Sequence, residues 1–395
     1  MKVTFAHLNI RFNSTYLLVP LFLIFSCTSD EILPLEEDDQ VVIVEKKQER
    51  LTTAELDYMT RLLIVEEELS GLWPDFENIR ECTTYIITGD GQGILMNPPE
   101  NYLAVSRPIL NEIEEYEEVP LYRNDILYNF ARQEIPENWF YGFTEYNGLP
   151  LYVYDMTYWP TTKNFYFDYK NRNGQFHVSV FYHELFHQYS VFKNYDRYVG
   201  DNWLQQVQRY PKTEETLPLQ LLLFDVMIDA YHAESIAEKT AILEYYVSIN
   251  HKLNEIDPTE DNLIKRHGFY QEKVEGAARY IEVYGTLNSL DNNTIDDPTH
   301  GYKEFAENIT NRGQITTVYG ARMFYHTGAG ATHLMKELGF QNLDQAYMIP
   351  TNTPYSLSES FLNMNTSERE NALAEAKSLY DWDALLQRAK YLLSL

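Results

Sequence analysis

His183, Glu184 and His187 form an H-E-x-x-H motif, the pattern in this sequence with the clearest chemical consequence. Residues four apart lie on one face of a helix, so both imidazoles can reach one zinc ion from the same side. Glu184 then lies where it can take a proton from water on the metal. The motif therefore predicts His183 and His187 as zinc ligands and Glu184 as a general base.

The sequence around the motif predicts a buried helix. Residues 179–193 contain no Gly or Pro, and apolar or aromatic side chains flank both histidines: Phe181, Tyr182, Leu185, Phe186, Tyr189, Val191 and Phe192. A helix that is apolar nearly all round is buried, and polar groups inside it need partners. The alternative is a chance match in which the two histidines are ordinary, hydrogen-bonded core residues.

A catalytic zinc ion usually has three protein ligands and one open position, so a third ligand is needed. The extended motif would place a histidine at position 193, but that residue is Lys193, and no Gly stands at position 190. The remaining downstream candidates are Glu234, Glu238 and Glu275. The neighbours of Glu234 are mostly polar, which indicates a solvated helix face.

We favour Glu275 as the third ligand because of the helix around it. The apolar positions 274, 277, 278 and 281 follow a helical period, and Glu275 lies beside that face. The small residues Gly276, Ala277 and Ala278 would let a second helix approach closely. A glycine inside a helix costs about 1 kcal/mol relative to alanine, and close approach is a reason for it. The alternative is that Glu275 is an exposed helix carboxylate.

The first residues predict export and a lipid anchor. Lys2 and Arg11 precede an apolar run over residues 16–25, which matches a signal-peptide core and is too short to span a membrane. The Ile-Phe-Ser-Cys stretch that ends at Cys27 resembles the lipobox of bacterial lipoproteins. This resemblance implies that residues 1–26 are removed and that Cys27 is lipidated. An ordinary secretory signal with an incidental cysteine is the alternative.

Residues 27–50 are polar and acidic and predict a tether. Acidic residues just after the cysteine resemble the export signals of some Gram-negative lipoproteins, which implies a lipid anchor in the outer membrane and exposure at the cell surface. The formal net charge is −28, and −30 without residues 1–26, which argues against nucleic acid or an anionic membrane as partner. The lipid anchor would be the only membrane contact, because no second segment predicts a membrane span.

Residues 51–395 predict an α+β domain. An N-cap at Thr53 and an apolar stripe predict a helix over residues 54–70. Turn signals and β-forming residues predict strands over residues 85–88, 94–96, 151–154, 164–169 and 176–180. Periodic apolar segments predict helices over residues 219–231, 233–253, 270–283 and 321–338. We expect a mixed-sheet lobe over about 51–195, a mainly helical lobe over 196–395, and a cleft between them.

The motif helix, followed much later by an E-G-x-A-x-Y helix that starts at Glu275, resembles the gluzincin metallopeptidases of the thermolysin-like superfamily. The chain is also similar to bacterial peptidase-like proteins in which that helix precedes a Y-x-x-G-A segment, which starts here at Tyr325. The resemblance covers about residues 176–340. Many gluzincins carry an acidic residue four positions after the third ligand, where this chain has Arg279.

The resemblance implies a zincin-like, two-lobed metallopeptidase fold with zinc on His183, His187 and Glu275. We therefore expect a surface-anchored zinc hydrolase, a peptidase acting on peptide or protein substrates. For the group that stabilises the oxyanion we favour Tyr325, with His326 and Tyr280 as further candidates, and aromatic packing is the alternative for each.

Two other functions stay open. One is a zinc-binding lipoprotein of low activity that serves as a binding component of a nutrient-import system, because ligand spacing does not report a rate. The other is a structural zinc site, which is less favoured because such sites prefer cysteine and four protein ligands. An intact Glu184 favours catalysis, since a structural site does not need it.

Overall fold

The computed structural model describes residues 49–76, 81–135, 139–157, 175–192, 202–286 and 306–395. All the described residues belong to one compact unit, Gln48–Leu395. The predicted signal segment, Cys27, most of the tether and the predicted strand over 164–169 lie outside the described residues. Among the helices of the described residues, none has the length and apolar character needed to cross a membrane.

A mixed sheet of seven strands confirms the α+β class, with strand order β1-β4-β5-β3-β2-β7-β6. The strands are β1 (Glu49–Arg50), β2 (Thr84–Gly89), β3 (Gln92–Met96), β4 (Arg107–Leu110), β5 (Leu121–Arg123), β6 (Tyr141–Tyr146) and β7 (Leu149–Asp155). β2 pairs with β7 and β1 with β4 in parallel, and the other neighbours are antiparallel. The predictions over 85–88, 94–96 and 151–154 are confirmed, whereas β1, β4, β5 and β6 were not predicted.

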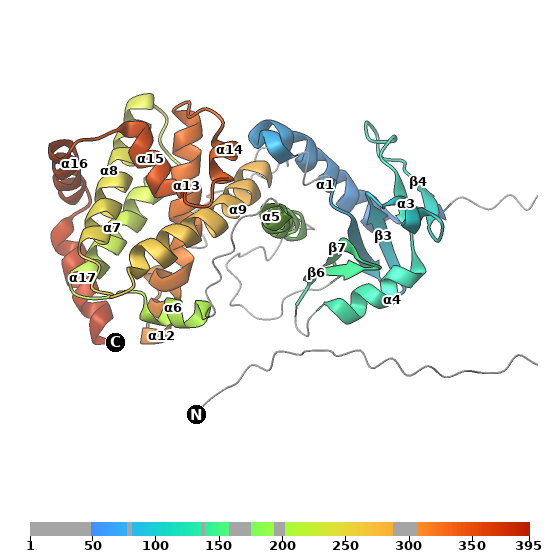
Figure 1. Ribbon diagram of the computed structural model, residues 1–395, viewed down its shortest axis with the longest axis horizontal. Coiled ribbons are helices and arrows are strands. Elements are labelled where there is room, and N and C mark those ends of the chain that lie inside the picture. The colour runs from blue at the N-terminus through green and yellow to red at the C-terminus, as the bar shows by residue number, and fades with distance from the viewer. Residues whose placement is uncertain (1–48, 77–80, 136–138, 158–174, 193–201, 287–305) are drawn as a thin grey trace, which may run out of the picture. The chain divides into compact units, whose positions relative to one another are not determined.

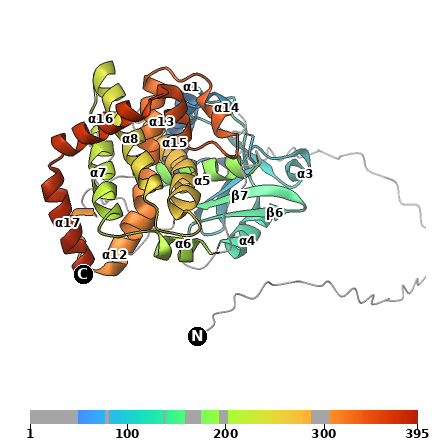
Figure 2. The same cartoon turned by 60° about the vertical axis from the view of Figure 1, so that its left-hand side comes forward.

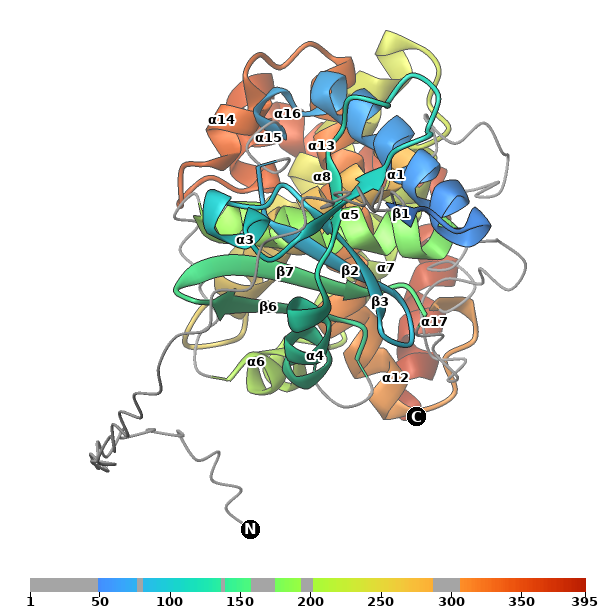
Figure 3. The ribbon, with the colours of Figure 1, turned by 90° about the vertical axis from the view of Figure 1, so that its right-hand side faces the viewer.

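Both faces of the sheet are buried at its central strands β2, β3 and β7, where successive side chains point to opposite faces and both sets are covered. Tyr85 and Ile87 of β2 face a small core with α3 (Glu100–Leu103) and α4 (Asp125–Glu134). Ile86 faces the main core instead, together with α1 (Thr53–Leu72) and α5 (Gln175–Phe192). Figure 3 looks toward the sheet, with α5 behind it. The sheet therefore supports the helix that carries the H-E-x-x-H motif.

The first helix begins one residue earlier than its sequence suggests. Thr52, not Thr53, is the N-cap of α1: its side chain accepts from the backbone N–H of Glu55, and the Glu55 carboxylate accepts from the N–H of Thr52. This reciprocal pair is a capping box. Because Thr52 and Thr53 are adjacent and both are good N-cap residues, the sequence alone does not distinguish between them. α1 then packs against α5, where the Tyr182 hydroxyl donates to the carbonyl of Leu62.

The motif helix is longer than predicted. Residues 176–180 are the first turns of α5 and not a strand, so that prediction was wrong. The segment is rich in Val and Phe, and such a short apolar run fits a buried helix as well as a strand. The hydroxyl of Tyr152 on β7 donates to the carbonyl of Phe181, which fixes α5 on the sheet. Figure 1 shows α5 end-on, with β7 on one side and α9 (Ala277–Tyr280) on the other.

Beyond residue 202 the described chain is helical, as expected. The predicted helices over 219–231, 233–253 and 321–338 correspond to α7 (Thr216–Asp229), α8 (Ile236–Glu255) and α13 (Met323–Glu337). The others are α6 (Trp203–Arg209), α12 (Arg312–Thr317), α14 (Leu343–Tyr347), α15 (Pro354–Leu362), α16 (Thr366–Leu379) and α17 (Trp382–Ser394). Figure 2 shows α16 and α17 along the outer side of α8 and α7, which they contact.

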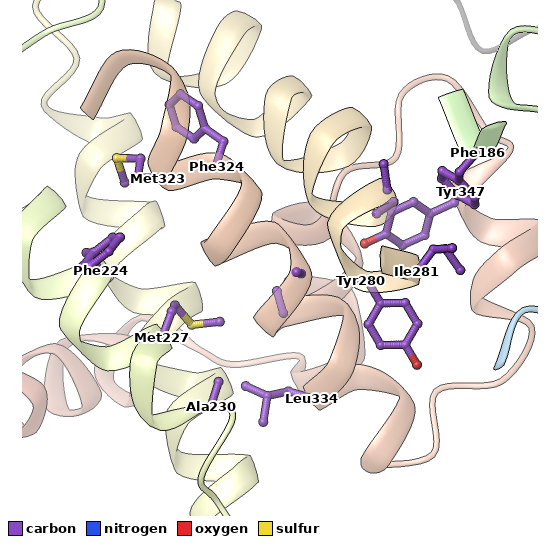
Figure 4. Close-up of a cluster of buried hydrophobic side chains, with 14 of the residues drawn as sticks. Phe186, Phe224, Met227, Ala230, Tyr280, Ile281, Met323, Phe324, Leu334 and Tyr347 are labelled. Atoms are coloured by element: carbon purple, nitrogen blue, oxygen red, sulfur yellow. The ribbon is translucent and has the colours of Figure 1, made fainter. Parts of the chain in front are cut away.

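The predicted helix over 270–283 is part of a longer helical stretch, residues 263–286, that contains three π-helical segments. These are η2 (Ile264–Phe269), η3 (Glu272–Gly276) and η4 (Ile281–Gly285), and α9 lies between the last two. Short π segments inside helices are frequent at functional sites. Figure 4 shows Tyr280 and Ile281 of this stretch in one apolar cluster with Met227 of α7, Leu334 of α13 and Phe186 of α5.

Candidate metal centre

His183, His187 and Glu275 come together in the structure, as the sequence predicted. His183 and His187 lie one turn apart on α5, and their Nε2 atoms are 3.1 Å apart. Glu275 reaches them from η3, with its Oε2 atom 3.2 Å from Nε2 of His187 and 3.6 Å from Nε2 of His183. Two segments about 90 residues apart in sequence thus present three ligand-type atoms to one point.

The three atoms fit a metal ion. Bond lengths of 2.0–2.1 Å in a tetrahedral zinc site place its ligand atoms about 3.3–3.4 Å apart. The separations between the two imidazoles and the Glu275 carboxylate match that spacing. The Oε2 atom of Glu275 is also buried, and the partners that face it here are the two imidazole nitrogens. A buried carboxylate needs compensating charge, which a cation between it and the two imidazoles would supply.

The charges at this cluster are strongly coupled. Burial lowers the pKa of the His183 imidazole, but Glu275 and Glu282 outweigh burial and raise that pKa to about 10. Burial raises the pKa of the Glu275 carboxyl, but His187 and His183 hold it well below its usual range. The carboxylate is therefore ionised and the cluster attracts positive charge. A metal ion would supply that charge in place of protons, which binding would release.

Glu184, the predicted general base, is partly buried next to the same cluster. Burial raises the pKa of its carboxyl above the usual value, although the charges of His183 and His187 oppose this rise. The hydroxyl of Tyr141 on β6 interacts with the Glu184 carboxylate, and burial together with the Glu184 charge raises the pKa of that hydroxyl. Tyr141 could not be identified from the sequence, because β6 itself was not predicted.

Glu282 is a second residue that sequence analysis missed. Its Oε2 atom lies 3.1 Å from Nδ1 of His183, which is the ring nitrogen that does not face His187 and Glu275. Its Oε1 atom accepts from Arg279, the residue that stands where many gluzincins have an acid. Glu282 follows Glu275 by seven residues, which is two helical turns and the same face, so the spacing alone could have indicated it.

The helix that carries Glu275 makes the close approach that its small residues predicted. η3 and α9 pack on α13, and a β carbon on Gly276 would lie 2.5 Å from the Cα atom of Gly328. Gly328 belongs to the Y-x-x-G-A segment and Gly276 to the E-G-x-A-x-Y segment. The two segments are thus direct neighbours, and their glycines meet.

The alternative third ligands are excluded by their positions. Glu234 and Glu238 are exposed at the start of α8. The Glu238 carboxylate accepts from the backbone N–H of Ser235 in a capping box, and these hydrogen bonds lower the pKa of its carboxyl. The Glu238 side chain therefore caps the helix, and neither carboxylate belongs to the histidine cluster.

The three candidate oxyanion donors have different surroundings. The ring of Tyr325 stacks on His183, with centroids 5.8 Å apart and planes 4° from parallel. The ring of His326 packs on Phe224 and Tyr231 instead. Tyr280 packs on Trp73 and Tyr284, and it is buried. Of the three candidates, Tyr325 is thus the one whose ring stacks on a histidine of the cluster.

Searches for known proteins similar to this chain, among protein-family models, curated proteins and solved structures, find no match.

Proposed function

We propose that this chain is a zinc-dependent hydrolase that cleaves peptide bonds, with zinc held by His183, His187 and Glu275. The observation that carries the proposal is the triangle formed by Nε2 of His183, Nε2 of His187 and Oε2 of Glu275. The two nitrogens are 3.1 Å apart, and the oxygen lies 3.2 Å from the nitrogen of His187 and 3.6 Å from that of His183. Two imidazoles and one carboxylate are a donor set of catalytic zinc sites, which leave a fourth position open. A structural site would need a fourth protein ligand, and the described residues place no other His, Cys, Asp or Glu in this group.

The residues around the triangle fit distinct roles. A bound zinc ion would polarise the scissile carbonyl and lower the pKa of water. Glu184 would take a proton from the attacking water and pass it to the leaving amine. Tyr141 would hold the Glu184 carboxylate in place through its hydroxyl. Tyr325, stacked on His183, would donate to the developing oxyanion.

A peptide substrate is supported by the edge of the sheet. Within the described residues, β6 pairs with β7 alone and stands last in the strand order. An edge strand presents backbone groups that pair with an extended chain. The hydroxyl of Tyr141 on this strand interacts with Glu184, so an extended peptide along β6 would pass beside the proposed base. With the sheet on one side of α5 and the helices on the other, the arrangement suits a two-lobed, zincin-like fold.

The proposed location is the outer membrane, with the enzyme anchored through a lipid on Cys27 and exposed at the cell surface. The basis is the sequence that ends at Cys27 and the acidic segment after it. The formal charge of −28 suits a solvated surface with peptide substrates and does not suit a nucleic-acid partner.

The test measures zinc content and hydrolysis together. Purified protein would be treated with chelator, reloaded with zinc and assayed on casein and a peptide library. We expect one zinc per chain and cleavage only in the loaded state. Glu275→Ala should lose both, whereas the exposed control Glu234→Ala should keep both. Protein that binds one zinc and cleaves nothing would favour the binding component of an import system, and protein that binds no zinc would refute the proposal.

A further inference from the structure

We propose that Glu282 is a positioning residue of the metal site, which orients the His183 ring through Nδ1 and is itself held by Arg279. This inference rests on the metal site of the proposed function. It concerns residues that neither the motif nor the expected ligand set includes. It also gives a role to Arg279, which stands where many gluzincins carry an acidic residue.

The first argument is that the two ring nitrogens of His183 face different partners. Nε2 faces His187 and Glu275, while Nδ1 lies 3.1 Å from Oε2 of Glu282. A neutral imidazole carries a proton on one nitrogen and a lone pair on the other. With Nδ1–H donating to Glu282, the lone pair of Nε2 points into the triangle. The contact thus selects the tautomer that a metal ligand needs.

The second argument is the fixation of Glu282 itself. The residue is 1% exposed and Arg279 is 3% exposed, so both charges are removed from water. A buried carboxylate requires a partner for each oxygen and a compensating charge. Oε2 accepts from Nδ1 of His183, and Oε1 accepts from Nη1 of Arg279. The guanidinium therefore allows a carboxylate at this depth and holds it against the imidazole.

The third argument is that one helical stretch supports both sides of the same ring. Glu275 lies in η3 and Glu282 in η4, two turns further along residues 263–286. Glu275 approaches the Nε2 side of His183 and Glu282 approaches Nδ1. Since η4 also packs on α5 and α1, the His183 ring is held by residues of helical segments and not by a loop. Such contacts determine the direction in which the Nε2 lone pair points, and metal affinity depends on that direction.

The experiment measures zinc binding in place of activity. Metal-free wild-type protein and Glu282→Gln would be titrated with zinc against a chromophoric chelator. The glutamine keeps the length of the side chain and removes its charge. We expect zinc affinity to fall by about 10- to 100-fold, the usual effect of removing such a partner. With cobalt as probe, the visible bands of the variant should shift, because the ligand field changes with the orientation of His183.

Glu272→Gln is the matched control. Glu272 lies in the same helical stretch and is 1% exposed, but its carboxylate accepts from Thr327 and Tyr246 and not from a histidine. This variant should bind zinc as the wild type does and give the same cobalt spectrum. A loss of affinity as large as that of Glu282→Gln would mean that any buried carboxylate of this stretch matters, and would overturn the inference.

A second variant guards against misfolding, because Glu282→Gln leaves Arg279 without its charged partner. Arg279→Met combined with Glu282→Leu removes both charges, an exchange that buried ion pairs often tolerate. The double variant should unfold at a urea concentration close to that of the wild type and still bind zinc about 10- to 100-fold more weakly. Wild-type zinc affinity in this folded variant would overturn the inference.

The results separate this inference from the proposed function. Wild-type protein that binds zinc tightly and cleaves nothing would refute the hydrolase, while a weaker Glu282→Gln would still support the positioning role. If the wild type cleaves peptides and Glu282→Gln binds zinc as tightly as the wild type does, only the positioning role is refuted. Wild-type protein that binds no zinc would refute both.

Discussion

The Cα atom of Gly328 lies where a side chain on Gly276 would have to begin. An added β carbon at Gly276 would be 2.5 Å from that atom and 2.7 Å from the carbonyl carbon of Gly328. In turn, a β carbon on Gly328 would collide with the backbone oxygen of Glu272. Because Gly276 follows Glu275 directly, this contact sets how far the third proposed ligand reaches toward α5.

Gly276→Ala should therefore destabilise the protein and weaken zinc binding. Forcing a methyl group into packed backbone costs about 1–3 kcal/mol, and the two helices must move apart to accept it. Urea unfolding of the metal-free protein gives the first quantity, and zinc titration gives the second. Gly71→Ala is the control, since its added β carbon meets nothing within 4 Å. That variant should be as stable as the wild type or slightly more so. Equal midpoints for both variants would contradict the close approach.

The site was more predictable from sequence than the sheet. The i, i+4 spacing of His183 and His187 determines their common face wherever that helix lies, and Glu275 stood out because small residues followed it. Glu282 was visible at the same helical spacing but had no small neighbours to mark it. Tyr141 had no local sign at all, since its position depends on how β6 pairs with β7.

The missed strands have physical reasons. β1, β4 and β5 have two to four residues each, too few to show an alternating pattern. β6 has a signal that could have been used: Asn147 and Gly148 both have positive φ, at 53° and 76°, and form its turn to β7. An Asn-Gly pair between two strands is a strong hairpin signal.

Glu184→Gln should abolish hydrolysis and leave zinc binding intact. The carboxylate would act as general base, and removing such a base typically lowers the rate by about 10²–10⁴-fold. The measurement is kcat on the best peptide of the library, with zinc content determined on the same sample. Glu234→Gln, an exposed carboxylate on α8, serves as the control and should keep wild-type kcat. Wild-type turnover in Glu184→Gln would show that the activity resides elsewhere.

Cys27→Ala should release the protein from the membrane fraction or leave residues 1–26 attached. The expected thioether-linked lipid needs the cysteine sulfur, so alanine cannot carry it. Fractionation of cells that express each form, followed by mass spectrometry of the mature N-terminus, provides the measurement. Cys82→Ala is the control, because Cys82 lies near the start of β2 and should not affect anchoring. A soluble wild-type protein without an acyl chain would contradict the lipoprotein prediction.

The stability of the sheet should depend on pH through Glu55 and Arg123. The Glu55 carboxylate on α1 accepts from both terminal nitrogens of Arg123 on β5, and the two residues are 2% and 7% exposed. Burial would raise the pKa of the Glu55 carboxyl, but hydrogen bonds from Arg123, Thr88 and Thr52 lower that pKa from 4.5 to about 2. A carboxylate whose pKa is lowered by folding stabilises the protein above its unfolded pKa. This contribution is present above pH 4.5 and is lost as pH falls toward 2.

Glu55→Gln should therefore lower the free energy of unfolding by about 3–5 kcal/mol at pH 7, because it removes the buried charged partner of the Arg123 guanidinium and leaves it, among the described residues, only the exposed Glu49 carboxylate at 3.7 Å. The difference from the wild type should shrink as pH falls below about 4.5, where unfolded Glu55 is protonated. Urea unfolding at pH 7, 5, 4 and 3 measures it. Asp57→Asn is the control on the same helix: its exposed pair with Arg61 contributes roughly 0.2–0.5 kcal/mol. A gap between wild type and Glu55→Gln that is equal at pH 7 and pH 3 would show that the Glu55 charge does not stabilise the fold.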